Sequence, residues 1–124
     1  MTGKYTEIVE IVAPDKAAAG SVVNVEVKIK NTWTSQVHIY CVAVVDSVRF
    51  IDWLSDWVDP GVTRDFSGAF YMGGADVRIL AQSWYEGLDG YLYKDDEKTK
   101  DVTLTELVPA FSEFAISDYR VLGR

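Results

Sequence analysis

Nucleophilic catalysis usually relies on histidine as its base, and this chain offers one candidate. A nucleophile requires a base within hydrogen-bond reach, and His38 is the single histidine in 124 residues. It begins an apolar run in which a structural histidine near a sheet edge is the expected role. Cys41, the single cysteine, lies in the same run and is expected to be a buried small hydrophobe. One cysteine excludes an intramolecular disulfide and a cysteine-rich zinc site. We therefore expect no enzyme and no cofactor.

A second group of candidates combines acids with tryptophans. On a short helical turn, Asp52, Asp56 and Asp59 would share one face. Calcium takes roughly six to eight oxygen ligands, which three carboxylates can supply together with carbonyls and water. The spacing matches no EF-hand loop, so these acids are weak metal candidates, and caps or solvated charges are the expected role. Trp53 and Trp57 are then expected to cover one end of the fold.

The segment Ser83–Glu97 is typical of a hairpin, with a turn-prone tip at Glu86–Gly90 and an acidic rim at Asp95–Glu97. Cross-strand pairing is the ordinary role of its dense aromatic residues. A binding surface is the alternative, since flat rings beside carboxylates and amides suit sugar rings and equally anchor a protein partner. With the tryptophans above, the candidate binding residues are Trp53, Trp57, Trp84, Tyr85, Tyr91 and Tyr93.

Alternation of apolar and polar residues predicts strands along most of the chain. It is cleanest over Val23–Ile29, whereas Val37–Val45 is apolar on both faces, as expected of a central strand. No helical pattern of comparable length competes with the strands. The spacing predicts an antiparallel sandwich or barrel, of which we expect the sandwich. Its other strands are expected at Thr6–Val12, Arg64–Met72, Asp76–Tyr85 and Lys98–Glu106.

One stretch also carries a family resemblance. Ala19-Gly20-Ser21 leads into Val23-x-Val25-x-Val27-x-Ile29-x-Asn31, which resembles the opening of bacterial and archaeal immunoglobulin-like modules, including adhesion-related and fibronectin-III-like domains. Pro60-Gly61 before Phe66-x-Gly68-x-Phe70 is similar to their mid-domain turn. The resemblance covers residues 5–106. It implies an immunoglobulin-like fold. Together with the spacing, we expect an all-β, antiparallel immunoglobulin-like β-sandwich of about seven strands plus a C-terminal extra strand.

The sandwich is expected to end at residue 108, and residues 109–124 are expected to form a tail strand. Three outcomes are open for this tail: it folds back on its own sheet, it pairs with a neighbouring subunit, or it begins a next module. Its apolar residues are the candidates for assembly: Phe111, Phe114, Ile116, Tyr119, Val121 and Leu122.

The charge and hydropathy of the chain limit the classes of partner that it is expected to bind. The net charge is −7 and the basic residues are scattered, so no nucleic-acid surface is expected. The longest apolar run falls far short of the ~20 residues that span a bilayer, and no signal peptide is evident at the start. We expect a non-catalytic structural or interaction module for assembly or adhesion, in a virion, surface-layer or secreted multidomain setting. Its partner is then a protein or a second copy. The alternative is a carbohydrate-binding module.

Overall fold

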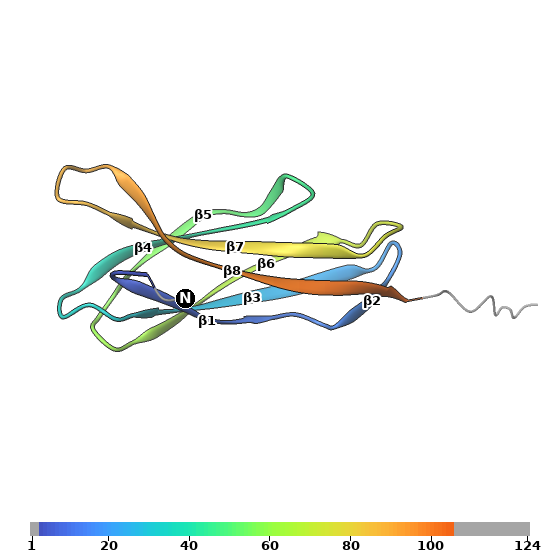
Figure 1. Ribbon diagram of the computed structural model, residues 1–124, viewed down its shortest axis with the longest axis horizontal. Coiled ribbons are helices and arrows are strands. Elements are labelled where there is room, and N and C mark those ends of the chain that lie inside the picture. The colour runs from blue at the N-terminus through green and yellow to red at the C-terminus, as the bar shows by residue number, and fades with distance from the viewer. Residues whose placement is uncertain (1–2, 106–124) are drawn as a thin grey trace, which may run out of the picture.

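The computed structural model describes residues 3–105, and every regular element in that range is a β-strand. The strands form two sheets, in the orders β1-β3-β6 and β2-β8-β7-β4-β5, which run along the long axis of the molecule (Figure 1). Neighbouring strands are antiparallel, except that the short β2 runs parallel to β8. The predicted all-β antiparallel sandwich is confirmed. Its strands are β1 (Thr6–Val12), β2 (Lys16–Ala18), β3 (Val22–Asn31), β4 (Val37–Val45), β5 (Val48–Val58), β6 (Thr63–Tyr71), β7 (Val77–Glu86) and β8 (Leu92–Thr105).

The core lies between the two sheets and follows the alternation of the sequence. Every second residue of β3 from Val23 to Ile29 is buried, and the same holds for β4 from Val37 to Val45. Burying one such valine or isoleucine side chain contributes about 1.5–3 kcal/mol. β4 pairs with β5 on one side and with β7 on the other, which confirms its predicted central position.

The helical turn proposed around Asp52–Asp59 is wrong, because these residues belong to β5 and its end. β5 pairs with β4 from Val48 to Val58, but the register shifts between the pairs Cys41–Leu54 and Ala43–Ile51. This bulge places Trp53 at a φ of 55°, a conformation that bulky residues rarely adopt. The bulge breaks the alternation within the strand, and for this reason the pattern did not predict a strand there.

The hairpin predicted at residues 83–97 is confirmed, with β7 and β8 as its arms. β8 begins at Leu92 and is therefore longer than the strand expected from Lys98 onward. The tail strand predicted at 109–124, with its six assembly candidates, lies outside the described residues.

Candidate functional site

Four segments meet at one end of the sandwich, which we call the aromatic end. They are residues 3–5, the β3–β4 loop at 32–36, the β5–β6 turn at 59–62 and the β7–β8 tip at 87–91, on the left in Figure 1. A groove of about 470 Å³ opens there. Its lining comprises Tyr5, Trp33, Ser35, Gln36, Val37, His38, Trp57, Tyr85, Glu86, Gly87 and Leu88.

One wall of the groove, the Tyr5 wall, consists of three aromatic rings. Tyr5 packs edge-to-face against Trp33, with ring centroids 4.6 Å apart, and against Tyr85 at 4.5 Å. Tyr85 in turn stacks on Tyr93 of the opposite hairpin arm at 5.6 Å. Edge-to-face and offset arrangements are the favoured geometries of aromatic pairs. The wall thus joins three segments that are far apart in the sequence.

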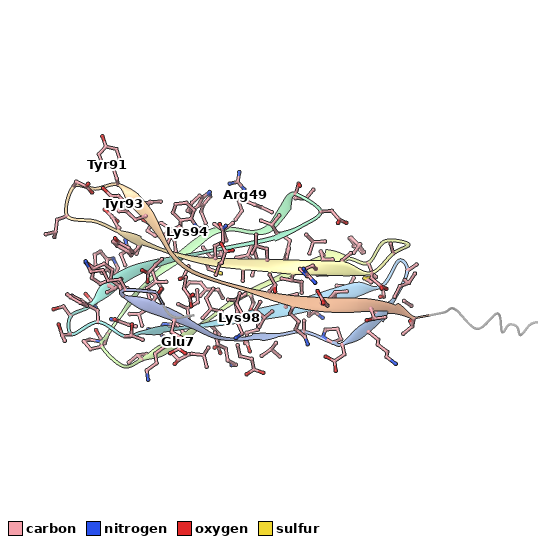
Figure 2. The ribbon with its side chains drawn as sticks, in the orientation of Figure 1. Glu7, Arg49, Tyr91, Tyr93, Lys94 and Lys98 are labelled. Atoms are coloured by element: carbon pink, nitrogen blue, oxygen red, sulfur yellow. The ribbon has the colours of Figure 1, made fainter. Side chains whose placement is uncertain are left out.

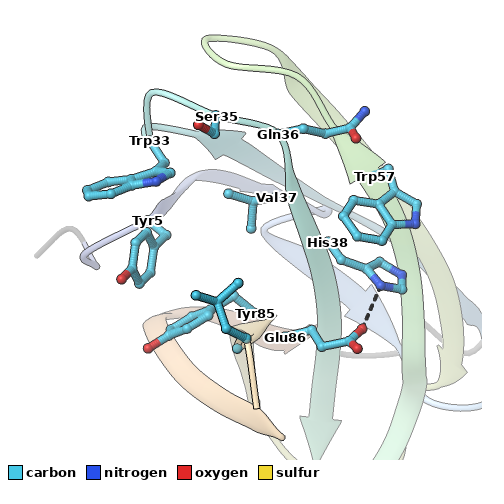
Figure 3. A pocket seen from close by; sticks show the side chains of 11 residues that line it. Tyr5, Trp33, Ser35, Gln36, Val37, His38, Trp57, Tyr85 and Glu86 are labelled. Carbon is cyan, nitrogen blue, oxygen red and sulfur yellow. Dashed lines mark hydrogen bonds and ion pairs between the residues drawn. The ribbon is translucent and has the colours of Figure 1, made fainter. Parts of the chain in front are cut away.

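The other wall, the His38 wall, consists of His38 stacked on Trp57, with centroids 4.5 Å apart and planes 16° apart. His38 Nδ1 lies 2.9 Å from Glu86 Oε1, which fixes the imidazole ring in place. The Tyr40 hydroxyl lies 3.4 Å from the same carboxylate oxygen. Burial, together with the negative charge of Glu86, raises the pKa of Tyr40, so its hydroxyl stays protonated. Figure 3 shows the His38 wall across the groove from Tyr5.

Asn31, the last residue of β3, holds the β3–β4 loop in place. Its side chain is fully buried. Nδ2 donates to the carbonyls of Ser35 and Val58, at 2.9 and 2.7 Å, and Oδ1 accepts from the Trp33 amide at 2.8 Å. The backbone N–H of Asn31 also donates to the carbonyl of Val62 at 3.0 Å. One side chain therefore connects the backbone of the β3–β4 loop, which carries Trp33, to the end of β5, where Trp57 lies.

Asp95 holds the other side of the groove. It is the extra residue of a β-bulge in β8, and its carboxylate accepts four hydrogen bonds of 2.6 to 3.0 Å. The donors are the amides of Lys4, Tyr5 and Thr6 and the hydroxyl of Thr6. Because hydrogen bonds to a charged group are stronger than neutral ones, this contact fixes the start of β1 and with it the ring of Tyr5.

Asp96, the next residue of β8, makes a similar contact with β1. Its Oδ2 accepts from the Ile8 amide at 2.8 Å, and its amide donates to the Ser83 hydroxyl, which also bonds Thr6. Asp96 is 7% exposed. The acidic rim predicted at Asp95–Glu97 is therefore wrong for its first two residues, because both carboxylates bind backbone amides of β1 and its approach.

The six candidate binding residues fall into three places. Trp57 and Tyr85 line the groove. Trp53 and Trp84 pack edge-to-face at 5.0 Å, and Trp84 alternates with buried Ser83, which places the pair on the outer face of the five-stranded sheet. The remaining two tyrosines lie on the hairpin, where the Tyr93 hydroxyl bonds Asp89 and Tyr91 projects into solvent (Figure 2).

Sequence reasoning missed much of the groove lining, above all Tyr5, Trp33, Gln36 and Glu86. Trp33 follows the turn signal Asn31-Thr32, and a tryptophan on an exposed loop is a signal that could have identified it. Tyr5 carries no such signal, because it reaches the groove only through the pairing of β1 with β3 and its contact with Asp95.

The three metal candidates do not converge. Asp52 pairs with Arg49 at 3.3 Å, Asp56 pairs with Arg64 at 2.9 Å, and Asp59 accepts from Gln36 at 3.0 Å. Within residues 3–105, no three His, Cys, Asp or Glu side chains form a group that could hold a metal ion. No helix in this range is long and apolar enough to cross a membrane.

No family model and no curated protein matches the chain. Solved structures do. The CARDB domain of a Pyrococcus furiosus protein, solved in complex with di-metal ions, matches with a TM-score of 0.64 at 15% identity, over 85% of this chain and 93% of that one. A Niemann-Pick type C2 protein from the Japanese carpenter ant matches with a TM-score of 0.42 at 9% identity, over 82% and 95%, too low to support an argument.

The first of these likenesses defines the class of fold. The chain is an immunoglobulin-like β-sandwich, as its resemblance to bacterial and archaeal modules implied. The likeness does not select the fibronectin-III-like branch of that resemblance. At 15% identity it concerns the fold alone, so the function has to be argued from the groove.

Proposed function

We propose that this chain is a non-catalytic interaction module for adhesion or assembly, which binds its partner through the groove at the aromatic end. The observation that carries the proposal is a groove with two aromatic walls, built on backbone segments that Asn31 and Asp95 tie together. Tyr and Trp are the residues that most often anchor interfaces. A virion, a surface layer or a secreted multidomain protein is the setting in which such a module acts.

Two features of the reactive side chains support a non-catalytic role. Burial raises the pKa of the Cys41 thiol to about 12, so the thiolate that would act as a nucleophile does not form near neutral pH. His38 is stacked under Trp57 and bonded to Glu86, an arrangement that suits a wall of a binding site.

The adhesion proposal is tested with beads that carry the full chain. Beads are mixed with a panel of bacterial and archaeal cells and with beads that carry the same chain, so that heterotypic and homotypic adhesion are scored together. Trp57→Ala removes a groove aromatic that is 54% exposed, and a central aromatic anchor of this kind is worth about 2 kcal/mol, or roughly 30-fold in affinity. We expect adhesion to be lost.

Tyr71→Ala is the matched control. Tyr71 is an exposed aromatic at the last residue of β6, at the opposite end of the sandwich. Adhesion that is unchanged in this variant, and lost with Trp57→Ala, supports the groove. Equal adhesion of both variants and the original chain contradicts the proposal, as does turnover of a substrate at the groove.

The tail gives the assembly proposal a second test. Light scattering across a range of concentrations measures the molar mass of the full chain and of a chain that ends at Pro109. A discrete oligomer that becomes a monomer on truncation supports assembly through the tail, whose candidates lie between Phe111 and Leu122. Two monomers contradict assembly through the tail and leave adhesion through the groove.

A further inference from the structure

We infer that the ligand of the groove is a carbohydrate, a step that rests on the proposed binding function and names its ligand class. The volume of about 470 Å³ falls within the range of roughly 300–1,000 Å³ that is typical of small-ligand sites. A groove of this size takes one or a few sugar rings at the end or bend of a glycan chain.

The walls offer ring faces to such a ligand. Trp33 is 41% exposed and Trp57 is 54% exposed, so both indoles are supported on one side and open to solvent on the other. Their supports are Tyr5 and His38. The C–H face of a pyranose ring packs against a flat aromatic surface, and Figure 3 shows the Trp33 and Trp57 rings on different sides of the groove.

The polar lining combines acceptors and donors, as the hydroxyl groups of a sugar require. Glu86 contacts His38 and Tyr40 through the same oxygen, Oε1. His38 uses Nδ1 for that contact, and Gln36 uses its Nε2 to bond Asp59. Within the described residues, these contacts leave Glu86 Oε2, His38 Nε2 and Gln36 Oε1 for a ligand.

The same lining disfavours other ligand classes. It contains no Lys or Arg, so an anion such as a phosphate would lack a counter-charge. Its one carboxylate, on Glu86, is already engaged by His38, which weakens it as a partner for a cation. A purely apolar anchor would cover Glu86 Oε2 and His38 Nε2 without bonding them, and a buried polar atom left unpaired carries a penalty.

Hydrogen bonds also hold the segments around the groove in place without a ligand. The Asn31 side chain fixes the loop that carries Trp33, and Asp95 fixes the segment that carries Tyr5. The Thr32 amide donates to the Tyr5 carbonyl at 2.9 Å and joins these two segments directly. Binding then requires little ordering of the protein, which matters for a ligand as hydrated and weakly bound as a sugar.

The test is calorimetric titration of the full chain with a panel of soluble glycans: linear β-glucans, xylan and mannan fragments, chitin oligosaccharides and peptidoglycan fragments. We expect saturable binding of at least one glycan class. Trp57→Ala should weaken it at least roughly tenfold, Gln36→Ala should weaken it by a few-fold, and Tyr71→Ala should leave it unchanged.

Two results would overturn the carbohydrate inference. In the first, no glycan binds to the original chain, although Trp57→Ala abolishes bead adhesion. This result supports the proposed function but indicates that the ligand is a protein. In the second, a glycan binds and Trp53→Ala removes binding while Trp57→Ala does not, which moves the site to the outer sheet face. If the original chain shows no adhesion and binds no glycan, the proposed function of the groove is contradicted together with the carbohydrate inference.

Discussion

The two ends of the sandwich are closed by different means. At the aromatic end, the buried side chain of Asn31 and the carboxylate of Asp95 bond backbone groups from distant segments. At the opposite end, the chain reverses through local turns, and backbone hydrogen bonds between residues 20–21 and Met72 join two of them. Asp46 and Ser47 form the two-residue β4–β5 connection with φ values of 52° and 67°, and Gly20 has a φ of 82°.

The difference shows what each end has to achieve. A hairpin turn joins two strands that are already paired, and residues that tolerate positive φ are sufficient for this. A groove between loops needs segments held at fixed distances although no strand pairing connects them. Long-range bonds from side chain to backbone meet that need, and those of Asn31 and Asp95 lie at the groove. Within residues 3–105, the opposite end has one such bond, from the Leu104 amide to the Asp76 carboxylate.

Replacing Asn31 should have the largest effect. Asn31→Ala leaves the Trp33 amide and the carbonyls of Ser35 and Val58 without their partner. The Val58 carbonyl is buried, and leaving it unpaired costs about 1–3 kcal/mol, whereas each of the two partly buried bonds contributes about 0.5–1.5 kcal/mol. We therefore expect the free energy of unfolding to fall by about 4 kcal/mol in urea titration. Asn24→Ala, at an exposed position of the same strand, should change it by less than about 0.5 kcal/mol. Equal effects would contradict the role of Asn31.

Asp95 comes second. Asp95→Ala removes the acceptor of four hydrogen bonds to residues 4–6 and should destabilise the fold by about 3 kcal/mol. Hydrogen exchange should accelerate first at the amides of Tyr5 and Thr6. Asp101→Ala, in the same strand, breaks an exposed ion pair with Arg78, and such pairs contribute at most about 1 kcal/mol. A loss as large for Asp101→Ala as for Asp95→Ala would rule out a special role for Asp95.

Cys41, midway along β4, gives a smaller effect that depends on pH. Burial raises the pKa of its thiol from 9.0 to about 12, so the folded state keeps the proton that the unfolded state releases. This contribution is complete below pH 9 and is lost between pH 9 and 12, about 1 kcal/mol of it between pH 9 and pH 10. Cys41→Ala should flatten that part of the curve of unfolding free energy against pH. An unchanged slope would show that the thiol titrates normally in the folded protein.

A substitution in the β4–β5 turn, at the opposite end, should have the smallest effect on stability, and it should stabilise the fold. Ser47 sits in the left-handed region, where glycine is the favoured residue of a two-residue turn. Ser47→Gly should raise the midpoint of urea unfolding and stabilise the fold by about 0.5–1 kcal/mol. The same measurement with Ser35→Gly, in a loop that lines the groove, should show no gain. A gain there as well would mean that both ends are closed by turn chemistry.

The fold could be predicted from the sequence to the extent that one face of each strand is buried. β3 and β7 alternate cleanly because the core side and the solvent side of each strand stay in phase throughout. β5 could not be predicted, because its bulge at Trp53 changes the phase and its edge position exposes most of its side chains.

The site could be predicted less well. Aromatic density identified Trp57 and Tyr85, but the same density also selected Trp53 and Trp84, which lie on a different surface. Asp95 has the appearance of one more solvated acid in the sequence. Its role depends on a bulge and on a segment some ninety residues earlier in the chain, and neither can be deduced from local pattern.

The four tryptophans permit a direct test of ligand binding in the groove. Trp33 and Trp57 line the groove, whereas Trp53 and Trp84 pack together on the outer sheet face. Their indole N–H signals are followed by ¹H–¹⁵N NMR while the full chain is titrated with the tightest-binding glycan of the panel. We predict saturable shifts of the Trp33 and Trp57 signals, with the Trp53 and Trp84 signals unmoved. Shifts confined to Trp53 and Trp84 would contradict this prediction and place the binding surface on the outer face.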